Sequence, residues 1–136
     1  MKRKQLHDST HLSLEDRKII QAGIENNSSK ASIARTIGKD ATAVAKEIRK
    51  HRMFKPRNTF NHPIICAKMK ICPVKPCLKK CDLYEEPKCN RRDKSPGACN
   101  KCKDSSKCHL DKYFYNALAA DQEYHRDLVD YRAGLN

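Results

Sequence analysis

Eight cysteines lie close together in this chain, all between residues 66 and 108. The segment that contains them is rich in proline and lysine and shows neither helical nor strand periodicity. Leu, Ile, Val and Phe account for only 24 of the 136 residues, and the net charge is +13. A chain of this composition buries too little apolar surface to fold by that means alone. We therefore expect the cysteines to supply the cross-links that stabilise the segment.

Structural zinc is the cross-link that the cysteine spacing favours. Four thiolates hold one tetrahedral zinc ion, so two ions are expected for Cys66, Cys72, Cys77, Cys81, Cys89, Cys99, Cys102 and Cys108. The strongest signal is CNKC at 99–102, because two intervening residues let both sulfurs reach one ion from a tight turn. The simplest partition gives the first four cysteines to one ion and the last four to the other. An interleaved partition stays open, as does replacement of a cysteine by His109 or His62.

The chain carries no sign of export or membrane insertion. Its N-terminus, MKRKQLHDST, lacks the apolar core of a signal peptide, and no apolar run approaches the roughly 20 residues of a membrane span. We therefore expect an intracellular protein with reduced thiols, where cysteine clusters bind metal more often than they form disulfides. Disulfides and unrelated free thiols are the alternatives.

A domain of three short helices is predicted for residues 1–57. Ser13 is expected to cap the first helix, with Asp16 three residues later as its capping-box partner. The apolar face of this helix is expected to contain Leu14, Ile19, Ile20 and Ile24. Ser29 is expected to cap the second helix.

The second and third helices are separated by a tight turn. Gly38 is expected to end the second helix, because glycine adopts a left-handed conformation without steric cost. Asp40 is expected to cap the third helix, whose Val44 and Ile48 form an apolar pair. This order of elements indicates a helix-turn-helix, in which the helix after the turn enters the major groove of DNA.

The outward face of the third helix is basic. The side chains expected to reach base edges are those of Thr42, Ala45, Lys46 and Arg49. Phosphate contacts, which add affinity but little sequence information, are assigned to Lys50, Arg52, Lys55 and Arg57. The N-terminal Lys2, Arg3 and Lys4 form either an arm in the minor groove or a solvated terminus.

The last part of the chain differs from the rest in charge. Residues 1–60 hold 14 basic and 6 acidic side chains and residues 61–109 hold 12 and 5, whereas residues 110–136 hold 3 and 5. This distribution suggests a polyanion partner for the first two parts and a protein contact for the third. One amphipathic helix is predicted from about residue 111 to 132. Its stripe either packs against the cysteine-rich segment or forms a homodimer, through Tyr113, Ala117, Ala120, Tyr124, Leu128 and Tyr131.

Residues 11–52, HLSLEDRKIIQAGIENNSSKASIARTIGKDATAVAKEIRKHR, closely resemble the N-terminal helix-turn-helix of bacterial insertion-sequence transposases of the IS-thirty family. TAVAKEI matches the reading helix of that family, with Lys46 where arginine is usual. Some members also contain a cysteine-rich stretch followed by a helix like YNALAADQEYHRDLVDYRAGLN. The resemblance implies sequence-specific binding to the terminal inverted repeats of a mobile element. It also implies a cytoplasmic, nucleoid-associated location, with a full-length transposase as a candidate partner.

The expected architecture is therefore mainly α-helical. It consists of a helix-turn-helix domain at 1–57, a loop-rich, zinc-stabilised cysteine module at 58–109 and an amphipathic helix at 110–136. Nothing in the chain resembles the catalytic domain of the family, with its two Asp and one Glu, so no enzymatic activity is expected. The alternatives are a zinc-dependent regulator at host promoters, a zinc-dependent protein-interaction module, and a redox enzyme that uses Cys99 and Cys102.

Overall fold

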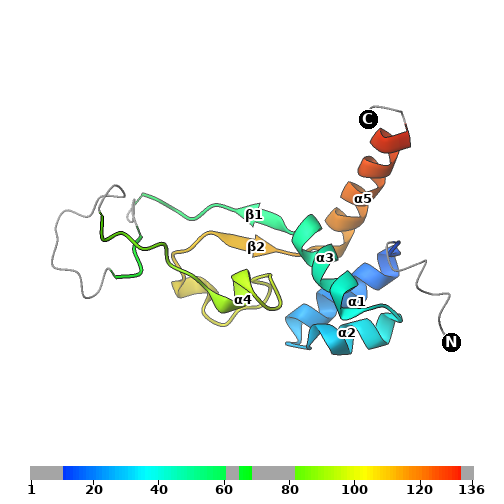
Figure 1. Ribbon diagram of the computed structural model, residues 1–136, viewed down its shortest axis with the longest axis horizontal. Helices are drawn as coiled ribbons and strands as arrows, with labels where there is room; N and C mark the ends of the chain where they lie inside the picture. The colour runs from blue at the N-terminus through cyan, green and yellow to red at the C-terminus, as the bar shows by residue number, and fades with distance from the viewer. Residues whose placement is uncertain (1–10, 61–64, 69–81, 133–136) are drawn as a thin grey trace.

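The structure, a computed structural model, describes residues 11–60, 65–68 and 82–132. Helices cluster at one end of the molecule, and a two-stranded ribbon extends from them toward the other end (Figure 1). No helix among the described residues is long and apolar enough to cross a membrane. Several residues of interest lie outside the described part of the chain, namely Lys2, Arg3, Lys4, His62, Cys72, Cys77 and Cys81.

The three predicted N-terminal helices are confirmed as α1 (Leu14–Glu25), α2 (Lys30–Ile37) and α3 (Ala41–His51). The capping box at the start of α1 forms, with the Asp16 N–H donating to Ser13 Oγ at 3.1 Å and the Ser13 N–H donating to Asp16 Oδ2 at 3.2 Å. Ser29 caps α2 in the predicted way. Both serines thus satisfy backbone donors that have no partner within their helices.

The turn between α2 and α3 depends on glycine. Gly38 ends α2 with φ at 73° and ψ at 33°, in the left-handed region that side chains with a Cβ rarely adopt. Asp40 occupies the position before α3, as predicted, but its side chain makes no capping hydrogen bond. The predicted cap is therefore correct in position only.

The core of the helical domain is formed by aliphatic side chains from all three helices, including Ile20, Ile24, Ile33, Val44 and Ile48. Helices α1 and α2 approach closely at Gly23, where an added Cβ would lie 2.5 Å from Ile33 Cγ1. The assignment of Ile19 to this core was wrong, since Ile19 is 36% exposed. Successive residues lie about 100° apart around a helix, and Arg17, not Ile19, shares the inward side with Ile20 and Ile24.

A short antiparallel ribbon joins distant parts of the sequence, and it was not predicted. Strand β1 (Met53–Lys55) pairs with β2 (Lys112–Phe114), so that Lys55 lies opposite Lys112. The predicted helix from about residue 111 therefore begins only at Ala117, as α5 (Ala117–Arg132). The aromatic residues before it favour a strand, and Asn116 Oδ1 accepts the Ala119 N–H at 2.9 Å to start the helix.

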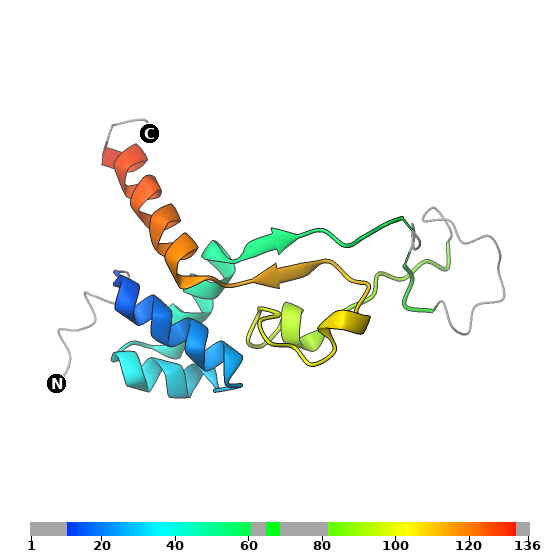
Figure 2. The ribbon, with the colours of Figure 1, turned by 180° about the vertical axis from the view of Figure 1, so that it is seen from behind.

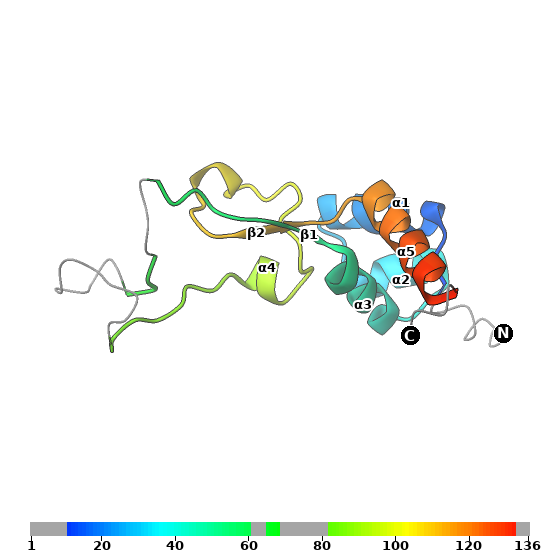
Figure 3. The same ribbon diagram turned by 90° about the horizontal axis from the view of Figure 1, so that it is seen from above.

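Helix α5 packs against α1 and α3 of the helix-turn-helix domain. It stands over these helices in the view from above (Figure 3), and from behind it leaves the domain beside the paired α1 and α2 (Figure 2). Ala117 and Ala120 of the predicted stripe are buried there, whereas Val129 and Tyr131 near the other end are exposed. The two predicted uses of the stripe were packing against the cysteine-rich segment and homodimer formation. The contact with the helix-turn-helix domain was not predicted.

A buried polar network fixes this arrangement. The Arg17 guanidinium donates to Glu47 Oε2 at 2.8 Å, to Asp121 Oδ1 at 3.0 Å and to the Leu12 carbonyl. The Tyr115 hydroxyl donates to the same Glu47 oxygen at 2.8 Å, and burial, with the neighbouring Glu47 carboxylate, raises the pKa of Tyr115 well above its usual value. The network thus connects α1, α3, the end of the ribbon and α5.

We expect Arg17→Met to lower the free energy of unfolding by about 3–5 kcal/mol, because the change leaves Glu47 as an unpaired buried charge. Unfolding in urea, followed by circular dichroism, measures the difference. Lys18→Met is the matched control: the Lys18 side chain is 58% exposed, and a change within about 0.5 kcal/mol is expected. Equal stability of the two variants would contradict the role given to Arg17.

Candidate DNA-binding interface

The outer face of α3 carries the side chains predicted to read DNA. Thr42, Lys46, Arg49 and Lys50 are exposed, and Ala45 beside them is half-buried. The opposite face is anchored by Val44 and Ile48, which are both fully buried. The helix therefore presents an exposed polar and basic face, and an α-helix is an element that the major groove of DNA admits.

Two polar side chains on the inner face of α3 were not predicted from the sequence. Glu47 belongs to the Arg17 network, and His51 is buried with its Nδ1 atom 2.6 Å from Glu123 Oε1 of α5. Their spacing of four residues places both on one side of the helix. This spacing is the sequence feature that could have indicated their inward position. Together they bind the reading helix to α1 and α5 and fix its orientation.

A hollow of about 280 Å³ lies between α3 and α5. Thr42, Lys46 and Lys50 line it from α3, Tyr124 lines it from α5, and Leu12 precedes α1. Tyr124 is held in place by a 2.7 Å hydrogen bond between its hydroxyl and His11 Nδ1. Helix α5 therefore forms one wall beside the reading face.

Positively charged residues lie close together where α3 borders α2 and the cysteine module. Lys30 Nζ donates to the Lys94 carbonyl at 3.3 Å, which brings the exposed Lys94 of the cysteine module next to the start of α2. Burial lowers the pKa of Lys30, and the nearby positive charge of Arg49 lowers it further. Cations held this close repel one another in the free protein and suit a surface that binds phosphate.

Arg52, predicted to bind phosphate, makes protein contacts in the structure. One of its guanidinium nitrogens donates to the Gly97 carbonyl at 2.9 Å and to the Arg92 carbonyl at 3.2 Å. The guanidinium also lies 3.8 Å from the centre of the Tyr113 ring. Arg52 therefore attaches the cysteine module to α3 and to the ribbon.

Two arginines of the cysteine module also point into the molecule. Arg91 donates to Asn27 Oδ1 at 2.9 Å and to the Ile24 carbonyl at the end of α1. Arg92, in the short helix α4 (Asn90–Asp93), hydrogen-bonds to Asp93 and thereby lowers the pKa of that carboxyl group to about 2. Both side chains fasten the module, while Lys101 and Lys103 remain exposed.

The last four cysteines lie near one another in the module. Burial raises the pKa of the Cys99 thiol, and the thiols of Cys89, Cys102 and Cys108 are close enough to raise it further. Cys108 Sγ also accepts the Leu110 N–H at 3.5 Å, just before β2. The donor set suits zinc in its chemistry. Within the described residues, however, no three His, Cys, Asp or Glu side chains are arranged as a metal site.

Of the first four cysteines, only Cys66 lies in the described part of the chain. Its sulfur accepts backbone N–H groups from Lys68 at 3.5 Å and from Glu85 at 3.3 Å. These contacts join the turn after Cys66 to the segment that contains Glu85. The five described cysteines, Cys66, Cys89, Cys99, Cys102 and Cys108, are free thiols.

Comparison with known proteins identifies the helical domain at the N-terminal end of the chain. Residues 9–51, about a third of the chain, match the family model described as a helix-turn-helix domain. No curated protein and no solved structure matches the chain. The matched residues end with α3, so the family model covers α1, α2 and the reading helix. The chain thus contains a helix-turn-helix domain, and DNA binding is the general function of that class.

We expect Arg52→Ala to lower the free energy of unfolding by about 1–3 kcal/mol, because it removes two charge-assisted hydrogen bonds and a cation–π contact. Arg49→Ala is the matched control on the outer face of α3, with an expected change within about 0.5 kcal/mol. Urea unfolding of both variants tests the assignment. It is contradicted if Arg49→Ala costs as much as Arg52→Ala.

Proposed function

We propose that this protein binds a specific DNA sequence through α3, with base contacts from Thr42, Ala45, Lys46 and Arg49. The observation that carries the proposal is the exposed basic face of α3 in a domain that matches the helix-turn-helix family model. In such domains the reading helix enters the major groove, where lysine and arginine donate to guanine O6 and N7. Burial of Glu47 and His51 against α1 and α5 supports a fixed orientation of that helix.

The cysteine module adds phosphate contacts in this proposal. Lys94 of the module, Lys30 of α2 and Arg49 of α3 form one cationic edge beside the reading face. Lys50 lies on the exposed face of α3 itself. Phosphate contacts of this kind position a protein on the duplex and make its affinity dependent on salt.

The DNA target that we propose is the terminal inverted repeat of a transposable element. The support is the resemblance of residues 11–52 to the N-terminal region of the IS-thirty transposases, and no catalytic step by the described residues is part of the proposal. A full-length transposase is the corresponding protein partner. The exposed end of α5, with Val129 and Tyr131, is the surface for a homodimer. A regulator at host promoters is the second candidate, which the genomic position of the bound sequence separates from the first.

Two structural zinc ions complete the proposal. Cys89, Cys99, Cys102 and Cys108 would hold one ion, supported by the proximity of their thiols. Cys66 would belong to the other, supported by the two backbone N–H groups that its sulfur accepts. Zinc supplies a tetrahedral cross-link in a segment with little core of its own, and its binding free energy is then folding free energy.

Selection of duplexes from a random DNA pool at near-physiological salt tests the reading helix. We expect the wild-type protein to enrich one motif and the Lys46→Ala/Arg49→Ala variant to lose it, with a cost of about 1–3 kcal/mol for each base contact. Lys103→Ala/Lys107→Ala is the matched control, because it removes the same charge from exposed positions of the cysteine module and should keep the motif.

A pool without enrichment, bound equally by the wild-type protein and the α3 variant, would overturn the proposal. The basic charge would then serve only non-specific phosphate binding. An interaction module that binds protein through the exposed end of α5 would become the better interpretation.

Metal analysis tests the zinc sites. We expect about two zinc ions per chain in the wild-type protein and about one in Cys108→Ser, because each tetrahedral site needs all four ligands. Removal of zinc with a chelator should lower the melting temperature, since binding and folding are linked. Ser106→Ala, an exposed neighbour, is the control and should retain both ions. A metal-free protein with eight reactive thiols and unchanged stability would refute the zinc sites.

A further inference from the structure

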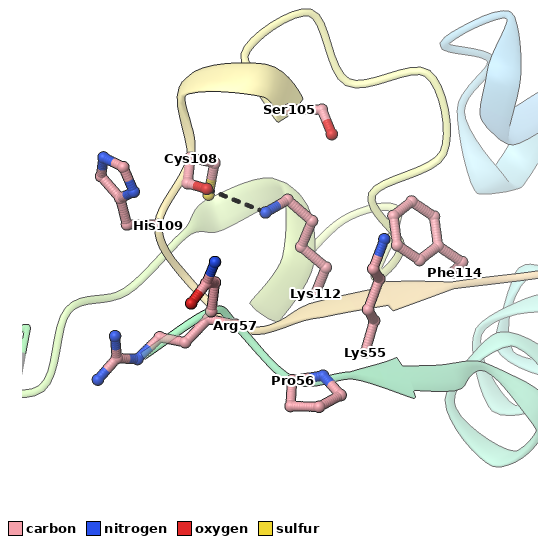
Figure 4. Close-up of a pocket in the computed structure, with 9 residues that line it drawn as sticks. Lys55, Pro56, Arg57, Ser105, Cys108, His109, Lys112 and Phe114 are labelled. Atoms are coloured by element: carbon pink, nitrogen blue, oxygen red, sulfur yellow. Dashed lines mark hydrogen bonds between the residues drawn. The ribbon is translucent and has the colours of Figure 1, made fainter. Parts of the chain in front are cut away.

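A basic cleft of about 430 Å³ lies beside the ribbon, and none of the described residues on its walls belongs to α3. One wall is formed by Lys55 and Lys112 from the two strands, and the other by the turn that carries Ser105 and Cys108 (Figure 4). Arg57 lines the cleft just after β1. Three cationic side chains thus border one opening, and no carboxylate is among the described residues that line it.

The two lysines are direct partners across the ribbon. Lys55 and Lys112 face each other in the antiparallel register, so their side chains emerge on the same face. Like charges directly opposite each other destabilise a pair of strands. An anion between them offsets that repulsion, so the pair indicates a site for a negatively charged ligand.

Lys112 is held in position for such a ligand. Its ammonium group donates to the Cys108 carbonyl at 3.0 Å and to the Leu110 carbonyl at 3.4 Å (Figure 4 shows the first contact). An ammonium group has three N–H donors, so these two contacts leave one donor for a ligand. The carbonyl contacts also fix the side chain, which lowers the entropic cost of binding.

We infer that this cleft binds a backbone phosphate of the same DNA that α3 reads, a conclusion that rests on the proposed function. The continuity of the chain supports the inference, because β1 begins only two residues after α3 ends at His51. Lys55 is four residues beyond His51, a distance of at most roughly 13 Å along an extended strand. At about 3.4 Å per base pair, this upper bound corresponds to about four base pairs, so the contact is expected in the immediate flank of the sequence bound by α3.

The salt dependence of binding to the selected duplex tests the inference. The variant is Lys55→Gln/Lys112→Gln, which removes both positive charges and keeps a polar N–H donor at each position. We expect the slope of log K against log salt to become shallower by about 0.9, because the variant no longer neutralises the one phosphate in the cleft. Hydroxyl-radical footprinting should show weaker protection in the flank of the motif, while protection of the motif remains.

Lys103→Gln/Lys107→Gln removes the same charge outside the cleft and should leave both the slope and the flanking protection unchanged. Lys55→Gln alone, at an exposed position, should produce about half the change in slope and guards against misfolding of the double variant. If the cleft variants behave like the control while the wild-type protein still binds its motif through Lys46 and Arg49, the inference fails and the proposed function stands. If no motif is selected at all, both fail.

Discussion

The buried pair between Arg17 and Glu47 is the contact on which the remaining architecture depends. A buried guanidinium is strongly destabilising unless acceptors satisfy its donors. Here the acceptors come from residues as far away in sequence as Asp121, 104 positions along the chain. The pair fixes α3 against α1, and Asp121 and Tyr115 extend the contact to α5 and the ribbon. The orientation of α3 is therefore set by a pair within the helix-turn-helix together with Asp121 and Tyr115, which lie outside it.

The cysteine module is attached to the domain by directed polar contacts and by Ala98, which is buried in the core of the helical domain. Asn100 pairs with the backbone of Tyr115 in both directions, with its amide donating to the carbonyl at 2.7 Å and its oxygen accepting the N–H at 2.9 Å. Arg52 adds the contacts to Gly97 and to the Tyr113 ring. Contacts of this kind specify one geometry but supply little burial, so the module requires another source of stability. The proposed zinc ions meet that requirement, and Cys108 would also order the turn whose carbonyl holds Lys112.

The basic side chains form three groups along the molecule, and a different contact with DNA is proposed for each group. Lys46 and Arg49 lie on the exposed face of α3 that we propose to contact base edges. Lys30 and Lys94 border this face, and Lys55 and Lys112 lie farther along the ribbon. Lys30 lies near Arg49, and Lys55 faces Lys112 across the ribbon, so like charges are close together in both regions, which costs stability in the free protein. A phosphate backbone running past all three groups would relieve that repulsion. The same charges are the reason that we expect affinity to depend on salt and propose that the ribbon contributes to it.

Local sequence signals determined the three N-terminal helices, because capping serines, the left-handed Gly38 and the spacing of Val44 and Ile48 act within a few residues of one another. They also determined which face of α3 carries the exposed Thr42, Lys46 and Arg49. The ribbon, the docking of α5 and the inward turn of Arg17, Arg52 and Arg91 were decided only by tertiary structure. Each of these depends on acceptors or strand partners that lie dozens of residues away, and a charged side chain alone does not reveal whether it will meet solvent or such a partner.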